Sequence, residues 1–251
     1  MGLEQAVVVL AGALAGGIVN GLTGFGTAIT AIGIWLYAIP PTAAASLAII
    51  CSVVAQAQTL PMIWRTIWWE RVAFFVAPGV LGVPIGTFLL PHIEPRYFKI
   101  GVGIFLVAYS IYVLARKGGF NSDWGGRIAD GMAGFGGGIL GGLTGLSGVP
   151  PVIWTDIHGW TKEQRRGVLQ AFNTSILSFA LVAHAVSGLL TRQVALQAAV
   201  ALPATIAGAW LGAFIYRRLH DHGYQRAVMI LLFVLGAALI WTSLMGAGSG
   251  L

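Results

Sequence analysis

Long apolar runs separated by short polar clusters dominate the pattern of this sequence. Two of the runs, Ile100–Leu114 and Ala227–Leu244, contain no charged residue at all. Helices that cross a bilayer need about 20 mostly apolar residues, and runs near this length recur along the chain. The pattern therefore predicts an all-α polytopic membrane protein. The expected apolar segments are Gln5–Asn20, Thr27–Ile39, Thr42–Trp64, Val72–Leu90 and Tyr97–Leu114 in the first half, and Ile128–Gly142, a short piece ending at Ile157, Gln164–Leu190, Val194–Tyr216 and Tyr224–Met245 in the second.

A glycine-rich stretch occurs twice among these segments. Residues 16–26 read GGIVNGLTGFG and residues 137–147 read GGILGGLTGLS, with seven of eleven positions identical and a spacing of 121 residues from Gly16 to Gly137. The duplication predicts two membrane repeats, residues 1–117 and 128–251, joined by a polar linker at 118–127. Tandem halves of this kind are common in secondary transporters.

Each glycine-rich stretch is expected to break its helix. Glycine in a helix interior costs about 0.5–1 kcal/mol relative to alanine, so dense glycine disfavours a continuous helix. The breaks are predicted at Gly21–Gly26 and at Gly145–Gly148. A competing interpretation is close helix packing, because Gly17-x-x-x-Gly21 and Gly138-x-x-x-Gly142 match the small-residue motif of membrane helix pairs.

The distribution of positive charge predicts how the chain crosses the membrane. Gln5–Asn20 would be a helix of only about 24 Å, short of the roughly 30 Å hydrocarbon core, so each broken unit is expected to form a hairpin that returns to its own side. This topology puts 11 Lys and Arg residues on one face and 3 on the other, whereas single crossings would give 8 and 6. The positive-inside rule favours the hairpins. Three full crossings then remain in each half, which predicts inverted repeats with both termini outside the cytoplasm.

Composition supports the membrane class and excludes others. The chain of 251 residues is 57% hydrophobic and 9% charged, whereas soluble domains carry about 25% charged residues. The net charge of +6 does not indicate nucleic-acid binding, because the Lys and Arg residues fall at predicted helix ends. The single Cys51 allows no internal disulfide and no cysteine metal cluster. We expect no cofactor and no metal.

The two breaks together form a candidate anion site. A broken helix presents unpaired backbone N–H groups and the positive end of its dipole, which bind anions without a charged side chain. Irregular backbone is tolerated inside a bilayer only where protein or water covers it. We expect a small anion between the breaks, with polar side chains of the following helices alongside. The predicted substrate-binding residues are Asn20, Thr23, Gly24, Phe25, Gly26, Gln56, Thr144, Gly145, Leu146, Ser147, Gly148 and Asn173.

Several polar residues allow a structural interpretation as well. Gln56 and Asn173 could instead form hydrogen bonds between helices, because a buried amide in a membrane is costly unless it is paired. His184 lies well inside an apolar segment and is either a proton relay or an interhelical hydrogen-bonding residue, the second being more common. Asp156 and His158 provide only two candidate metal ligands, so a loop or capping role is expected. No catalytic constellation is apparent in the sequence.

The paired glycine-rich motifs near residues 16–29 and 137–150 resemble those of the sulfite exporter TauE/SafE family. The four-plus-four apolar pattern and the helices with a proline followed by a glycine (Pro78 and Gly86, Pro203 and Gly212) share this resemblance, which covers nearly the whole chain. It implies a secondary transporter of the bacterial inner membrane for small sulfur oxyanions or organosulfonates, such as sulfite or sulfoacetate. Its expected partners are the anion, membrane lipid and, as one option, a second copy in a homodimer.

Other functions remain open at this point. An enzyme acting on lipid-linked substrates should cluster Asp, Glu or His at one membrane face, and the sequence does not. A non-enzymatic membrane subunit would explain packing glycines but not their duplicated placement at helix breaks. A drug/metabolite carrier also has inverted repeats. No Asp or Glu falls deep in a predicted span, and proton-coupled carriers usually keep a titratable group there, so we expect export of the anion driven by the membrane potential.

Overall fold

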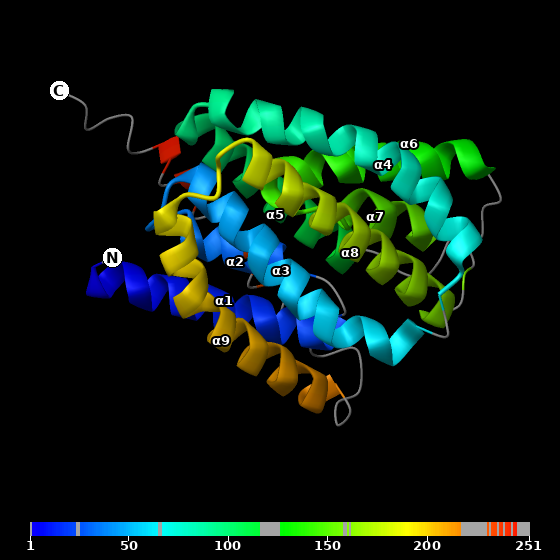
Figure 1. Cartoon of the computed structure of the whole chain (residues 1–251), viewed down its shortest axis with the longest axis horizontal. Helices are drawn as coiled ribbons and strands as arrows, with labels where there is room; N and C mark the ends of the chain where they lie inside the picture. Colours follow the sequence, from blue (N-terminus) through cyan, green and yellow to red (C-terminus); the bar gives the residue numbers. More distant parts are fainter. Residues whose placement is uncertain are drawn as a thin grey trace.

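The computed structural model describes residues 2–23, 26–64, 67–115, 126–157, 160, 162–216, 230, 232–234, 236–237, 239–241 and 243–244. Within these residues the regular structure is helical and contains no strand (Figure 1). Among the described residues, five helices are long and apolar enough to cross a membrane. These observations confirm the predicted all-α polytopic membrane class. The candidate spans are Leu3–Leu22, Pro41–Pro61, Trp69–His92, Gln164–Val186 and Arg192–Ile215.

The order of long and short helices in the first half recurs in the second. In each half a long helix is followed by a helix of nine residues and then by further long helices. The first half contains α1 (Leu3–Thr23), α2 (Thr27–Trp35), α3 (Pro41–Ile63), α4 (Trp69–Leu89), the short 3-10 helix η2 (Leu90–His92) and α5 (Pro95–Ala115). The second half contains α6 (Gly126–Thr144), α7 (Val149–Ile157), α8 (Lys162–Val186) and α9 (Arg192–Tyr216), followed by further helical residues between 230 and 244.

The first helix is longer than the sequence predicted. It runs for 21 residues and continues through Gly21, so the predicted break at Gly21 and the predicted length of 16 residues were wrong. The physical reason is tertiary packing, because a Cβ atom on Gly21 would collide with the backbone of Ala209 and Ala213 in α9. At roughly 32 Å, α1 is long enough to span the hydrocarbon core.

Each nine-residue helix turns back along the long helix before it. The indole Nε1 of Trp35 in α2 donates to the carbonyl oxygen of Val9 in α1 at 3.0 Å. In the second half, Nε1 of Trp154 in α7 donates to the Asp130 carboxylate in α6 at 2.8 Å. Val9 and Asp130 are 121 residues apart, the same spacing as the glycine-rich stretches. Two antiparallel hairpins therefore form, each closed by a tryptophan that donates to the long helix at positions related by the repeat.

The two halves are joined by helix pairs that cross between them. The most extensive pairings are α1 with α9 and α4 with α6. In the first pair, a Cβ on Gly208 would meet Leu14 O at 2.5 Å and Ile18 N at 3.0 Å. In the second, a Cβ on Gly82 would meet the backbone of Phe135 and Ile139, which lie 121 residues after Leu14 and Ile18.

The same interfaces contain the four glycines of the small-residue motifs. Gly17 and Gly21 approach the α9 backbone, and Gly138 and Gly142 approach the α4 backbone. Packing is therefore the structural role of these glycines, as in other membrane helix pairs. The glycines of the breaks themselves lie elsewhere.

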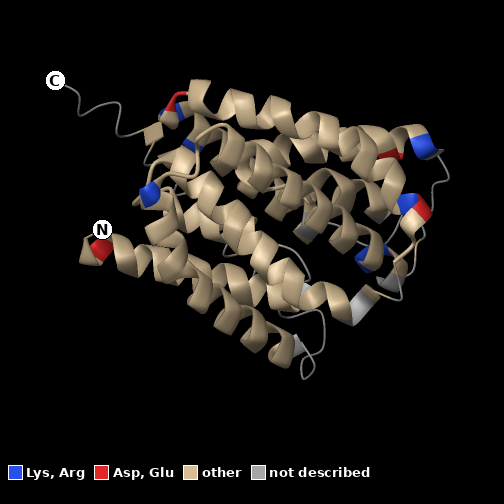
Figure 2. Cartoon of the chain, in the orientation of Figure 1, with Lys and Arg blue, Asp and Glu red and all other residues tan. Residues whose placement is uncertain are grey.

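Among the described residues, the charged ones gather at the two ends of the long axis, and the belt between them is almost free of charged residues (Figure 2). At one end Arg71 pairs with Asp130 at 2.8 Å, and Arg127 pairs with Glu70 at 2.9 Å. The Arg71 guanidinium also lies 5.2 Å from the ring centre of Trp160. An uncharged belt between charged ends is what a bilayer-spanning bundle requires.

The opposite end has a neutral version of this arrangement. The residues that match Asp130 and Trp154 in role are Val9 and Trp35. Gly82 and Gly208 occupy equivalent places in α4 and α9, and the same spacing of 126 residues relates Arg71 to Gln197. Gln197 is fully buried, and its amide atoms have no hydrogen-bond partner among the described residues.

Candidate functional site

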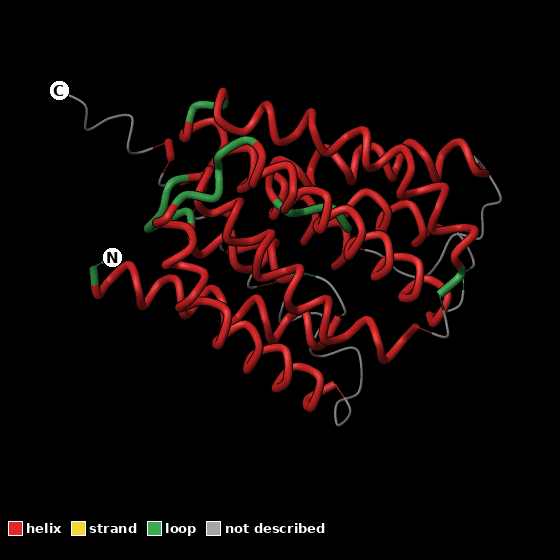
Figure 3. Tube along the Cα trace, in the orientation of Figure 1, coloured by secondary structure: helices red, strands yellow, loops and turns green. Residues whose placement is uncertain are grey.

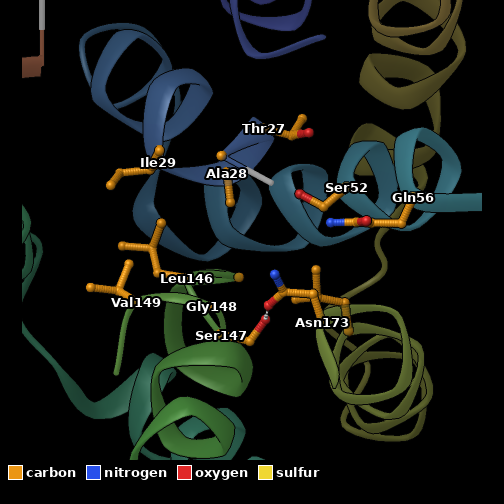
Figure 4. A pocket seen from close by; sticks show the side chains of 13 residues that line it. Thr27, Ala28, Ile29, Ser52, Gln56, Leu146, Ser147, Gly148, Val149 and Asn173 are labelled. Atoms are coloured by element: carbon orange, nitrogen blue, oxygen red, sulfur yellow. Dashed lines mark hydrogen bonds between the residues drawn. The ribbon is translucent and has the colours of Figure 1, made fainter. Parts of the chain in front are cut away.

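A cavity of about 20 Å³ lies where the two breaks meet (Figure 4). Most loops lie at the ends of the bundle, but loop segments also lie about halfway along the long axis, among the helices (Figure 3). The cavity is formed by the first break with α2, the second break with α7, and the middle of α3 and α8. Its lining residues are Gly26, Thr27, Ala28, Ile29, Ser52, Gln56, Gly145, Leu146, Ser147, Gly148, Val149, Asn173 and Leu177.

The lining residues are related by the internal repeat. Ten of the thirteen form five pairs whose members are 121 positions apart in the sequence. Both halves therefore contribute the same positions, with different side chains, to one cavity. The pairs are Gly26 with Ser147, Thr27 with Gly148, Ala28 with Val149, Ser52 with Asn173, and Gln56 with Leu177.

The first break directs backbone donors toward the cavity. Gly26 adopts φ of 101°, a left-handed conformation that glycine reaches without strain, and α2 begins at the next residue. The first hydrogen bond of α2 runs from Thr30 N to Gly26 O at 3.2 Å. The N–H groups of residues 27–29, all of which line the cavity, have no acceptor within the helix.

The second break offers fewer backbone donors. Gly145 adopts φ of 76°, and the first hydrogen bond of α7 runs from Val152 N to Gly148 O at 2.9 Å. Pro150 and Pro151 have no N–H group. Within the first turn of α7, the Val149 amide is therefore the donor available to the cavity.

Buried polar side chains complete the lining. The hydroxyls of Thr27 and Ser52 and Oε1 of Gln56 are buried and have no hydrogen-bond partner among the described residues. The three side chains are 1%, 3% and 2% exposed. A buried polar atom without a partner is costly, and native structures rarely leave one without water or a ligand. Three such atoms at one cavity indicate a polar occupant.

Asn173 is held in place by the second break. Ser147 Oγ donates to Asn173 Oδ1 at 2.7 Å, which leaves the amide nitrogen free to donate elsewhere. Figure 4 shows this nitrogen pointing toward the cavity. A Cβ atom on Gly148 would lie 2.7 Å from the same nitrogen. Glycine at this position therefore leaves the space that the Asn173 amide occupies.

The site is polar but uncharged. None of the described residues that line it is Asp, Glu, Lys, Arg or His. Its donors are backbone N–H groups, hydroxyls and side-chain amides. Such a set binds small anions when helix N-termini point at them, and it lacks the acid, base or nucleophile pairings on which hydrolytic catalysis depends.

Seven of the predicted site residues line the cavity: Gly26, Gln56, Gly145, Leu146, Ser147, Gly148 and Asn173. Asn20 is fully buried in α1 but is not part of the lining, and both of its amide atoms lack a partner among the described residues. Gly24 and Phe25 lie outside the described residues, as does the side chain of Thr23.

Thr144 has a structural position instead. Its hydroxyl donates to Leu140 O at 2.8 Å and accepts from Leu146 N at 3.3 Å. These bonds cap the end of α6, so the threonine shapes the break without lining the cavity.

The sequence reasoning missed several lining residues, including Thr27 and Ser52. Their signal was present in the repeat spacing, because subtracting 121 from Gly148 and Asn173 leads to these two positions. Ala28, Ile29, Val149 and Leu177 are apolar and gave no signal of their own.

His184 forms hydrogen bonds with both ring nitrogens. Nε2 lies 2.7 Å from Gly142 O, and Nδ1 lies 2.9 Å from Ser46 Oγ. The residue is fully buried and links α8 to α6 and α3, which supports the structural interpretation. The Asp156 side chain and His158 lie outside what the structure describes, and the described residues contain no group of three or more His, Cys, Asp or Glu that could hold a metal.

The fold and the cavity define a polytopic helical membrane protein with an uncharged polar site between two helix breaks. This architecture is typical of secondary transporters that bind solutes at discontinuous helices. The model of the family described as "Sulfite exporter TauE/SafE" matches residues 8–239, nearly the whole chain. The chain belongs to this family and is a multi-pass membrane transporter of the sulfite-exporter type. No curated protein and no solved structure matches it.

Proposed function

We propose that the protein exports a small sulfur oxyanion, with sulfite as the leading candidate, across a bacterial inner membrane, and that the cavity between the breaks is its binding site. The observation that carries this proposal is the set of unpaired polar atoms on Thr27, Ser52 and Gln56 beside the α2 N-terminus. The two hydroxyls and the N–H groups at the start of α2 are neutral donors, which suit an anion, whereas Oε1 of Gln56 is an acceptor. Membership of the sulfite exporter family supplies the class of substrate.

The proposed mechanism uses two inverted repeats, residues 1–117 and 128–251, with a linker at 118–127. In Figure 1, α1 and α6 run in opposite directions along the long axis, and so do α3 and α8. The relation of these helices supports a cavity that opens alternately to each side, because inverted repeats can exchange conformations.

Both termini are proposed to face away from the cytoplasm. Arg71 and Arg127 lie at one end of the bundle, while Arg192 begins α9 at the opposite end, in agreement with the charge grouping of the hairpin topology. A reporter that works only in the cytoplasm can be fused after Leu251. Activity of this fusion would contradict the proposed orientation.

The two other partners are also proposals. Membrane lipid is expected to cover the large exposed apolar side chains, such as Leu81, Phe88 and Trp210, and a homodimer stays a prediction. Among the rival functions, a drug/metabolite carrier would bind an organic solute in place of the anion, and the flux experiment below separates the two. A membrane subunit without transport activity would leave the unpaired cavity atoms unexplained.

Flux through the purified protein in proteoliposomes tests the proposed function. Sulfite, thiosulfate, sulfoacetate and taurine are compared in parallel with protein-free liposomes. We expect saturable sulfite flux, and the inhibition of this flux by each of the other solutes measures whether the site accepts that solute. Absence of sulfite flux with robust flux of an uncharged organic solute would favour the metabolite carrier, and absence of any flux would favour the membrane subunit.

A further inference from the structure

The cavity lies at the positive ends of two helices. α2 and α7, nine residues each, both begin at the lining. The aligned peptide dipoles of a helix are equivalent to about +0.5 elementary charge at its N-terminus. Two such ends together supply at most about one positive charge, because Pro150 and Pro151 remove two N–H groups from the α7 end, and the lining side chains add none.

The opposing end of α6 does not cancel this charge fully, because three carbonyl groups near this end are already bound by other donors. Leu140 O accepts from the Thr144 hydroxyl and from Leu146 N, Gly141 O accepts from Gly145 N, and Gly142 O accepts from His184. Three carbonyls near the end of α6 are thus paired with donors other than a cavity occupant.

The remaining polar groups stabilise an anion without neutralising it. The Thr27 and Ser52 hydroxyls are buried and unpaired among the residues described, and the Asn173 amide nitrogen points inward. Hydroxyl and amide donors solvate an ion but bring no full charge. In a buried site the cost of desolvation rises with the square of the ionic charge, so a second negative charge would have no counterpart.

We propose that the site selects its substrate by charge and accepts singly charged oxyanions, so that sulfite binds and crosses as hydrogen sulfite. This inference rests on the proposed function and narrows its substrate class. Sulfate and sulfoacetate, which carry two negative charges at neutral pH, are excluded from the site. Because hydrogen sulfite loses its proton near neutral pH to become doubly charged sulfite, the substrate itself makes transport pH-dependent.

The protein groups that could imitate such a pH dependence are few. On the helices that line the cavity, the described titratable side chains nearest to it in sequence are Cys51 in α3 and His184 in α8. Neither lines the cavity. The charged residues of α6 and α8 whose side chains are described are Arg127, Asp130, Arg165 and Arg166, and none of these belongs to the lining either.

The experiment compares sulfite with chlorate. Chlorate is also a pyramidal oxyanion with three oxygen atoms, but it carries one negative charge at every pH used. Flux of labelled sulfite into proteoliposomes is measured from about pH 6 to about pH 8, with chlorate and sulfate as competitors. Above the pKa of hydrogen sulfite, the apparent affinity for total sulfite should fall about tenfold per pH unit. Chlorate should inhibit sulfite flux equally at the lowest and the highest pH of this range. A hundredfold excess of sulfate should not inhibit the flux.

Each outcome bears on a different claim. Sulfite flux with an affinity independent of pH, or inhibition by sulfate as strong as by chlorate, would overturn the charge selection and leave the proposed function standing. A pH profile that disappears in His184→Gln would assign the titration to the protein and would also overturn it. The absence of sulfite flux at every pH would remove the proposed function, and this inference with it.

Discussion

At the scale of single residues, the cavity depends on which polar atoms are paired and which are not. Ser147 and Asn173 are bonded to each other at 2.7 Å, whereas Ser52, the repeat counterpart of Asn173, has no partner among the residues described. The two halves thus place a fixed amide and an unpaired hydroxyl at related positions of one site.

Replacing Ser147 tests whether that fixed amide matters. Ser147→Ala removes the donor that orients Asn173, and a neutral hydrogen bond contributes about 0.5–1.5 kcal/mol. We expect sulfite affinity to weaken roughly 2- to 10-fold with unchanged yield of folded protein. Titration of the purified variant measures the effect, and a change below twofold would mean that Asn173 needs no support from Ser147.

At the scale of helices, glycine has two roles that the sequence alone does not distinguish, which are breaking a helix and allowing another helix to pack closely. Gly145 and Gly148 fall at the break predicted for them, and α6 and α7 end and begin around it as expected. Gly21 looked equivalent but packs on Ala209 in α9, which lies almost 190 positions away. The helical class, the second break and most of the lining could be predicted because their signals are local. The extent of α1 could not, because it depends on that distant contact.

The glycine interface between α4 and α6 allows a matched comparison. A Cβ on Gly138 would meet the Gly79 backbone, whereas a Cβ on Gly131 in the same helix would lie 3.4 Å from a Pro78 side-chain atom, an ordinary contact. We expect Gly138→Ala to lower the apparent melting temperature in detergent and Gly131→Ala to leave it nearly unchanged. Equal melting temperatures for the two variants would contradict the tight packing of these helices.

The ion pair between Arg71 and Asp130, at one end of the bundle, is expected to affect stability because removing one partner leaves the other charge unpaired. Asp130→Val leaves the Arg71 guanidinium without its carboxylate, and loss of one partner from a buried pair costs about 3 kcal/mol or more. Because Arg71 is still 19% exposed, water recovers part of this cost. Arg71→Gln combined with Asp130→Val copies the neutral Gln197 and Val9 of the other end. The double variant should melt at a higher temperature than Asp130→Val alone, and further destabilisation would show that the neutral arrangement does not transfer.

At the scale of the whole molecule, the absence of charge from the described cavity bears on the energetics of transport. An anion leaving a cell that is negative inside gains about 2.3 kcal/mol per charge for each 100 mV, equivalent to roughly a 50-fold gradient. We therefore expect flux of the anion to follow the membrane potential without a coupling ion.

A potential set by valinomycin and potassium, with no pH gradient, checks this expectation. The rate of sulfite movement should rise when the potential drives anions in the measured direction and fall when it is reversed. Transport that ignores the potential but follows an imposed pH gradient would contradict it, and loss of that response in His184→Ala would make His184 the coupling residue.

The proposed transport depends above all on binding of the anion in the cavity between the breaks. The most direct measurement is sulfite affinity, by titration of purified protein, in Ser52→Ala and Gln56→Leu beside the control Ser110→Ala. Ser110 is a buried serine in α5 whose hydroxyl bonds Leu106 O at 2.7 Å and does not line the cavity. We predict that each cavity variant weakens binding about tenfold or more, while the control binds as the unmodified protein does. Unchanged affinity in both cavity variants, with all proteins folded, would contradict the site.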